Sequence, residues 1–190
     1  MKKEFSPQVH RDHYFKHYDK WDRFISYYTK VDAVKKLKNI KTILEKGIGN
    51  KTVTNYLKEH GYDLTSCDFD RNLNPDVVAD IRDLPFKKNN FDVVLCCEVL
   101  EHLPLKDVPK ALSELHKASK KYVIISVPYY SAYFEVYIRG SLGYFLKMLR
   151  FVISIPYFFI KPRFSGEHYW GMGIKGISKK ILKKHIENAG

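Results

Sequence analysis

The chain has 190 residues, a length typical of one domain, and 45% of them are hydrophobic, which is enough for a sizeable core. Its three cysteines show no paired spacing of the kind that binds zinc, and the first residues, MKKEFSPQVHRDHYF, lack the apolar run of a signal peptide. The formal net charge of +12 would suit nucleic acid or an anionic membrane, but the lysines are spread along predicted helices beside acidic residues. These features indicate one cytoplasmic domain and disfavour nucleic acid as a partner.

The first 39 residues predict a helix with one aromatic face. The residues on this face are Tyr14, Tyr18, Trp21, Ile25, Tyr28 and Val31, with Phe24 beside them. Rings at helical spacing are typical of a helix that packs against the edge of a domain. We therefore expect this helix to lie on the core with that face inward.

Residues 40–70 predict a strand, a glycine turn, a helix and a second strand that ends in an acidic residue. The turn contains Gly47 and Gly49, helical spacing runs from Val53 to His60, and the second strand, Tyr62 to Cys67, delivers Asp68. Glycines let a backbone approach a ligand, the helix start offers free N–H groups, and the carboxylate can bridge two ribose hydroxyls. The unit is typical of nucleotide binding. A dinucleotide dehydrogenase would carry a third glycine, where this chain has Lys51.

The next elements predict a parallel sheet. A short strand, Asp76 to Ala79, is followed by a continuous apolar run, Phe91 to Cys97, which is typical of a central strand buried on both faces. Asp107 is expected to cap a helix whose first turn contains Pro109 and which leads to a strand at 122–127. Alternating strands and helices with short links indicate an α/β domain with right-handed crossovers.

The sequence Asp80-Ile81-Arg82-Asp83-Leu84-Pro85-Phe86 and the segment from Asn90 to His102 give an "LPF…FDVV…EVLEHL" pattern. In these motifs, and in order and spacing from Lys41 to Pro128, the chain resembles the class I S-adenosylmethionine (SAM)-dependent methyltransferases of the type 11 group. The resemblance implies a three-layer Rossmann-like sheet, mostly parallel. The antiparallel strand pair that normally completes that sheet is missing after the last predicted helix, 176–190. Lys46 and Lys51 also depart from the family pattern.

The resemblance further implies SAM as the cofactor and a set of residues that bind it. These are Glu45, Gly47, Gly49, Asp68, Phe69, Asp80, Ile81 and Glu98. It also implies that the aromatic helix of residues 1–39 covers the cofactor and substrate, above a core formed by residues 40–128. Asp83 is interpreted as ordinary turn chemistry before Leu84 and Pro85.

Residues 129–175 are predicted to form an apolar lid or insert. Within it, Ser141 to Ile160 approaches the length of a membrane span but is interrupted by Lys147, Arg150 and Pro156. Three interpretations stay open: a lid over an apolar substrate, a segment lying in a membrane interface with Lys161 and Arg163 at its rim, or a buried insertion.

The catalytic residues are predicted to be His102 and His168, either of which could act as a general base. If a helix starts near Glu98, then Glu98, Glu101 and His102 face one point at the end of a central strand. This run is similar to a Glu-x-x-Glu-His cation site of small-RNA 2′-O-methyltransferases, in which a distant histidine, here His168, completes the set. We assign no metal, and name Glu98, Glu101, His102 and His168 as the set that would hold one.

The sequence therefore predicts one domain over residues 1–190 that transfers a methyl group from SAM to a small, apolar or lipid-like acceptor. The alternatives are a non-catalytic domain of this fold that binds a partner or membrane surface, and an RNA 2′-O-methyltransferase. Peripheral membrane contact and a homodimer formed over the exposed sheet edge are the further expectations for partners.

Overall fold

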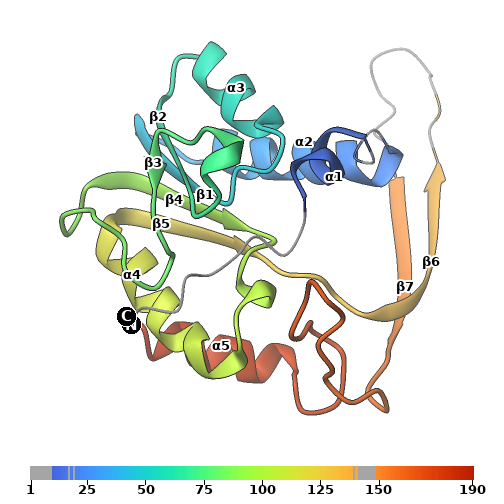
Figure 1. Ribbon diagram of the computed structural model, residues 1–190. Helices are drawn as coiled ribbons and strands as arrows, with labels where there is room; N and C mark the ends of the chain where they lie inside the picture. The colour runs from blue at the N-terminus through green and yellow to red at the C-terminus, as the bar shows by residue number, and fades with distance from the viewer. Residues whose placement is uncertain (1–9, 17, 19, 139, 141–148) are drawn as a thin grey trace.

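The computed structural model, shown in Figure 1, describes residues 10–16, 18, 20–138, 140 and 149–190 and has a five-stranded parallel sheet at its centre. The strand order is β3-β2-β1-β4-β5. The strands are β1 (Thr42–Lys46), β2 (Asp63–Asp68), β3 (Val77–Val78), β4 (Phe91–Cys97) and β5 (Ser119–Ser126). All seven residues of β4 are buried, which explains its continuous apolar sequence. The predicted Rossmann-like sheet is confirmed, with β5 at one edge, bonded only to β4 among the described strands.

Helices cover both faces of the sheet and make three layers, as Figure 1 shows. One face carries α2 (Trp21–Lys35) and α3 (Thr52–Glu59), and the other carries α4 (Val108–Ala118) and α5 (Lys179–Glu187). Successive side chains of a strand point to opposite faces of the sheet, so Val93 packs with the α2–α3 core and Val94 with the α4–α5 core. The remaining short helices are α1 (Arg11–Lys16), η1 (Arg71–Leu73), η2 (Leu100–His102) and η3 (Leu105–Asp107).

The expected inward face of the N-terminal helix is wrong in part for α2. Trp21 is 74% exposed and Tyr28 is 69% exposed, whereas Val31 packs against the core as expected, together with Tyr27 and Val34, which the prediction did not include. The prediction treated residues 14–31 as one continuous helix. Because α2 begins anew at Trp21, the helical phase set by the earlier tyrosines does not continue through it.

Asp107 does not cap α4 as expected. It occupies the position before the helix, but its backbone is right-handed helical and its side chain makes no capping hydrogen bond. Its carboxylate instead accepts a hydrogen bond from the Arg82 guanidinium at 3.0 Å. Pro109 lies in the first turn as predicted.

The insert between β5 and α5 contains a two-stranded antiparallel ribbon of β6 (Ser131–Ile138) and β7 (Leu149–Pro156). Within the apolar segment 141–160, residues 149–156 thus form a strand. The expectation for residues 141–148 lies outside the described residues. No helix in the described part of the chain has both the length and the apolar character needed to cross a bilayer.

Lys51 departs from the glycine expected at its position and adopts the backbone conformation that a glycine there would favour. Its φ is +64°, in the left-handed region, and it immediately precedes α3. Its Nζ donates to the Asn74 carbonyl at 2.5 Å, so the side chain lies along the outside of the loop. A residue other than glycine at this φ strains the backbone.

Replacing Lys51 by glycine and by alanine should separate backbone strain from the loss of the amine. Both variants lose the bond to Asn74, but only alanine keeps a Cβ at positive φ. We expect Lys51→Gly to be about 1 kcal/mol more stable than Lys51→Ala, as measured by urea unfolding. Equal stability of the two would show that the turn is not strained.

Candidate functional site

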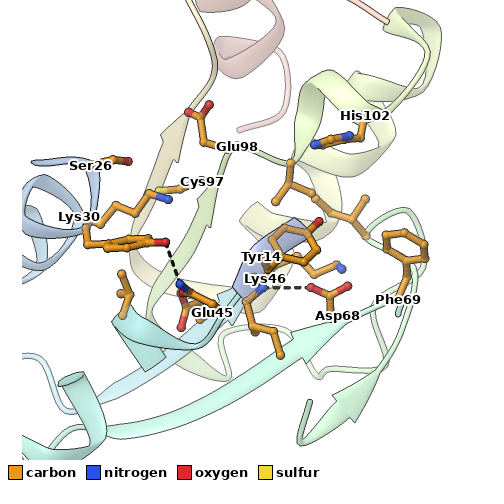
Figure 2. A pocket seen from close by; sticks show the side chains of 18 of the residues that line it. Tyr14, Ser26, Lys30, Glu45, Lys46, Asp68, Phe69, Cys97, Glu98 and His102 are labelled. Carbon is orange, nitrogen blue, oxygen red and sulfur yellow. Dashed lines mark hydrogen bonds between the residues drawn. The ribbon is translucent and has the colours of Figure 1, made fainter. Parts of the chain in front are cut away.

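A pocket lies where β1, β2 and β4 end, and Figure 2 shows the side chains that line it. Parallel strands bring their carboxyl ends to one edge, which is where ligands bind in open α/β sheets. All eight residues expected to bind the cofactor line this pocket: Glu45, Gly47, Gly49, Asp68, Phe69, Asp80, Ile81 and Glu98. His102 lines it as well, on the same side as Glu98 in Figure 2.

The glycine loop has no room for a side chain at its first glycine. A Cβ on Gly47 would lie 2.2 Å from Cγ2 of Val99, and the φ of Gly47 is +85°. The backbone N–H of Gly47 donates to the Cys67 carbonyl at 3.0 Å, which ties the loop to the end of β2. Only glycine therefore fits here, and the bare backbone forms part of the pocket wall.

The Asp68 carboxylate, at the end of β2, accepts a hydrogen bond from the backbone of the same loop. Its Oδ2 accepts a hydrogen bond from the Ile48 N–H at 3.0 Å, drawn dashed in Figure 2, and its Oδ1 accepts one from the Asp70 N–H at 3.0 Å. A carboxylate has about four lone-pair sites, so about two are left for a ligand. Asp68 can thus fix the loop and still accept hydrogen bonds from hydroxyl groups.

Arg82 engages the carboxylate of Asp80 at the pocket wall. The guanidinium binds both oxygens, and the Arg82 backbone N–H adds a bond to Oδ1 at 2.8 Å. Partial burial raises the pKa of Asp80, but hydrogen bonds and charge from Arg82 outweigh it and lower the pKa overall. Asp80 is therefore an ionised acceptor of fixed orientation. Asp83 donates its backbone N–H to the Asp80 carbonyl, which fits its interpretation as a turn residue.

Glu45 lies beneath the loop, 5% exposed, where its carboxylate accepts a hydrogen bond from the Thr54 hydroxyl. Burial raises the pKa of Glu45 to about 7, although the bond from Thr54 acts in the opposite direction. Lys46, the next residue, is 1% exposed and its Nζ lies 5.9 Å from the centre of the Phe69 ring. The floor of the pocket therefore combines a carboxyl and an ammonium group with little contact to solvent.

Glu98 adopts an unusual backbone at the end of β4. Its φ is +57°, in the left-handed region that residues other than glycine seldom occupy. Its N–H donates to the Ser126 carbonyl at 2.9 Å, and its Oε1 accepts from the Ser126 hydroxyl at 2.7 Å. Neighbouring β5 thus holds both the backbone and the side chain of Glu98, and strain of this kind is concentrated at functional sites.

His102, which lines the pocket, contacts His168, which comes from a distant part of the sequence and is not among the residues that line the pocket. Their ring centres are 4.7 Å apart and the rings are nearly perpendicular. Nδ1 of His102 lies 3.0 Å from the Glu167 carbonyl, and Nδ1 of His168 lies 3.1 Å from the Tyr130 hydroxyl. Burial lowers the pKa of both histidines, and the neighbouring His168 adds to the effect on His102. Both rings are therefore neutral at pH 7.

Glu101 lies behind these histidines and is completely buried. Neither of its carboxylate oxygens has a hydrogen-bond partner among the described residues. Glu101, His102 and His168 offer ligand atoms within 4.8 Å of one another, an oxygen–nitrogen set that could hold a divalent cation.

Glu98 does not join this group, contrary to the expectation that Glu98, Glu101 and His102 share one helical face. The turn of η2 begins only at Leu100, and Glu98 precedes it in a left-handed conformation. Its carboxylate accordingly bonds to Ser126. The spacing of residues 98 to 102 predicted a helix that the backbone does not form.

Several residues in and near the pocket were not identified from the sequence. Val99 packs against Gly47, Tyr130 orients His168, and Tyr27 accepts a hydrogen bond from the Asn50 amide at 3.0 Å. Tyr130 lies in the segment between the end of β5 at Ser126 and the start of β6 at Ser131, and this position is the one local signal that could have indicated it. Tyr14 and Tyr18 line the pocket, as the expected aromatic cover would.

The buried carboxyl of Glu101 should make stability depend on pH. Burial raises its pKa to about 8 from the ordinary 4.5, and the nearby Glu98 charge contributes. Because the folded protein binds this proton more tightly, the stabilisation is complete below about pH 4.5 and is lost as the pH rises through about 8. Wild-type protein should lose up to about 1.4 kcal/mol per pH unit in this window relative to Glu101→Gln.

Urea unfolding at a series of pH values would measure this difference. The exposed Glu59 on α3, changed to glutamine, is the matched control and should leave the pH dependence of wild type unaltered. Parallel stability curves for wild type and Glu101→Gln would contradict a raised pKa.

Comparison with known proteins agrees with this geometry. Residues 44–126, which run from β1 to the end of β5, match a family model described as a methyltransferase domain. No curated protein matches the chain significantly.

Many solved structures share the fold. An S-adenosylmethionine-dependent methyltransferase from Clostridium acetobutylicum superimposes with a TM-score of 0.57 at 12% identity, covering 94% of this chain and 86% of that one. The 1,6-didemethyltoxoflavin-N1-methyltransferase of Burkholderia thailandensis gives 0.55 at 15% identity, covering 94% and 72%. A protein from Pyrococcus horikoshii gives 0.51 at 16% identity, where 60% of this chain spans only 63% of that one.

At these identities the structures show the fold alone, and the match to a methyltransferase domain rests on residues 44–126. The residues present also fit SAM: the Gly47 backbone is bare, and Asp68 keeps lone pairs toward the pocket. Residues 44–126 thus match a methyltransferase domain, and they form the Rossmann-like sheet whose strand ends carry the pocket.

Proposed function

We propose that the protein transfers a methyl group from SAM to a small, apolar or lipid-like acceptor, with His102 or His168 as general base. The observation that carries this proposal is that the eight expected cofactor residues line one pocket together with His102. When bound, SAM supplies an electrophilic methyl group on a sulfonium centre. The protein's own part is to position the two reactants and to accept a proton.

The cofactor side of the pocket is assigned residue by residue. The bare backbone at Gly47 and Gly49 would hold the methionine part of SAM, and Asp68 would accept hydrogen bonds from the ribose hydroxyls. Asp80, held ionised by Arg82, would accept from the adenine amino group, and Phe69 and Ile81 would hold the adenine ring. Glu45 supports the loop from below through Thr54.

The acceptor side is aromatic and aliphatic. Tyr14, Tyr18, Tyr27, Val99 and Leu103 line the pocket, a surface suited to an apolar or ring-containing molecule. The Burkholderia thailandensis structure is described with bound 1,6-didemethyltoxoflavin and S-adenosylhomocysteine, which is in keeping with a small acceptor.

His102 is the preferred candidate for the base because its contact with a carbonyl fixes which ring nitrogen carries the proton. A carbonyl oxygen can only accept, so Nδ1 of His102 carries the proton that faces Glu167, and Nε2 is the basic nitrogen of the neutral ring. The lowered pKa keeps this ring neutral at pH 7. His168, with its ring nitrogen on Tyr130, can take the proton onward or serve as the base itself.

Removing the Asp68 carboxylate should weaken SAM binding. Asp68→Ala is expected to cost about 2–3 kcal/mol of binding free energy, since charge-assisted hydrogen bonds are lost, and titration calorimetry would measure it. Asp63→Ala, at the exposed start of the same strand, is the matched control and should bind SAM normally. Unchanged affinity in a folded Asp68→Ala variant would exclude the ribose role.

Removing the base should slow turnover without abolishing SAM binding. S-adenosylhomocysteine release, measured with a panel of phenolic and lipid acceptors, should fall about 100-fold or more in His102→Ala or His168→Ala. His60→Ala, an exposed histidine at the end of α3, should keep wild-type turnover.

The pH dependence of turnover and the effect of a chelator show whether the histidines act as bases or as cation ligands. Because the pKa of each histidine is lowered from 6.5, protonation should reduce kcat/KM only at pH values below 6.5. Chelation should leave turnover unchanged if the histidines act as bases. Loss of activity on chelation would instead assign Glu101, His102 and His168 to a required cation, and full activity of both variants would make the cluster structural.

A further inference from the structure

The β6–β7 ribbon is a separate two-stranded sheet, and Figure 1 shows it to one side of the five-stranded sheet. Eight residue pairs join its strands, from Ser131 opposite Pro156 to Ile138 opposite Leu149. Isolated two-stranded ribbons need a hydrophobic face packed against something to be stable in water. The composition of the two faces of this ribbon therefore indicates what it packs against.

The register assigns every side chain to a face, because residues directly opposite in an antiparallel pair point the same way and neighbours along a strand point oppositely. One face, here called the apolar face, consists of Ala132, Phe134, Val136, Ile138, Leu149, Phe151, Ile153 and Ile155. It contains no polar side chain. Phe134, Ile138, Leu149, Phe151 and Ile155 are each at least 60% exposed, and Ile153 is 55% exposed.

The other face is mixed. It carries Ser131, Tyr133, Glu135, Tyr137, Arg150, Val152, Ser154 and Pro156. Glu135 and Arg150 form an ion pair, and the Arg150 guanidinium lies 5.8 Å from the centre of the Tyr137 ring. A ribbon with one purely apolar face and one mixed face that carries an ion pair is suited to lying at a boundary between water and an apolar phase.

A second apolar cluster and a basic rim follow the ribbon. Phe158 and Phe159 are both 67% exposed, and Lys161 and Arg163 beyond them are exposed as well. Aromatic side chains beside basic ones are typical of the membrane–water interface. In the described residues from 128 to 164 the one acidic side chain, Glu135, is paired to Arg150, which leaves Lys161 and Arg163 as uncompensated positive charges.

The charge of the whole chain discriminates between the two occupants that an apolar surface of this kind could have. A second copy would carry the same net charge of +12, so charge repulsion opposes self-association over this face. An anionic lipid surface attracts the same charge.

We propose that the apolar face of the ribbon, with Phe158 and Phe159 beside it, docks on an anionic lipid bilayer, with Lys161 and Arg163 at the headgroups. The ribbon lies in the interface and does not cross it. This contact uses the ribbon and residues 158–163, and it requires neither a bound methyl acceptor nor a functional base.

Flotation of the full chain with vesicles tests the proposal. The protein should bind vesicles of phosphatidylcholine mixed with phosphatidylglycerol, bind phosphatidylcholine vesicles much more weakly, and be released in part by high salt. The double variant Phe151→Ser/Ile153→Ser, on the apolar face, should lower the partition constant about tenfold or more.

Two further variants serve as matched comparisons. Tyr133→Ser/Val152→Ser removes exposed apolar side chains of the opposite face at neighbouring positions and should bind as wild type. Lys161→Glu/Arg163→Glu leaves the ribbon untouched and should weaken binding to the anionic vesicles alone, which keeps the test valid if a ribbon variant fails to fold.

Failure of the wild type to bind anionic vesicles would overturn the proposal, as would equal losses for the variants of the two faces. Light scattering addresses the rival occupant. A stable wild-type dimer that Phe151→Ser/Ile153→Ser converts to a monomer would assign the apolar face to a second copy of the chain and overturn lipid docking. A wild-type SAM affinity in the ribbon variants, measured by calorimetry, would separate these outcomes from any failure of the proposed function.

Discussion

The pair of backbone bonds accepted by Asp68 is the constraint on which the rest of the site depends. One bond holds the glycine loop after β1, and the other holds the segment after β2. The two crossovers that leave neighbouring strands are thereby fixed to a single carboxylate. Gly47 can then lie against Val99 at a distance that no side chain would allow, which connects the loop to the turn after β4. The buried carboxylate of Asp68 and the glycine at position 47 thus position the ends of β1, β2 and β4.

Burial controls the charge of this site as much as composition does. Glu45 and Glu101 both lie out of contact with water, and their raised pKa values mean that protonated carboxyl groups persist near neutral pH. Asp80 is kept ionised by Arg82. The site therefore carries fewer negative charges than its number of acidic residues suggests, and Asp80 is the one that a neighbouring arginine keeps charged. The two histidines, neutral for the same reason of burial, complete a site whose protonation is set mainly by desolvation.

The core of the fold could be predicted because its signals are local. The βαβ unit, the fully buried β4 and the amphipathic α4 follow from periodicity within single segments. The clustering of the eight predicted cofactor residues in one pocket follows from parallel strands ending at one edge. The errors arose where a local backbone choice interrupted a periodicity. Glu98 in a left-handed conformation broke the expected helical face, and the new start at Trp21 shifted the phase of α2.

Other features depend on contacts that no local pattern records. Asp107 bonds to Arg82, 25 residues away, instead of capping its own helix. Tyr130 meets His168 across 38 residues, and His102 meets the Glu167 carbonyl across 65. The apolar run at 149–156 could have been a lid helix or a strand from its composition, and only pairing with β6 decides between them. Tertiary contact therefore determined the parts of the site that the sequence left open.

The root of the ribbon lies at a tyrosine that also contacts the site. Tyr130 precedes β6, its carbonyl accepts the N–H of Tyr157 just after β7 at 3.1 Å, and its hydroxyl meets Nδ1 of His168 at 3.1 Å. Both strands of the ribbon thus close on one residue, so the residue that anchors the ribbon also carries the phenol that contacts the histidine. Any free energy that links the ribbon to His168 through this tyrosine acts equally in both directions.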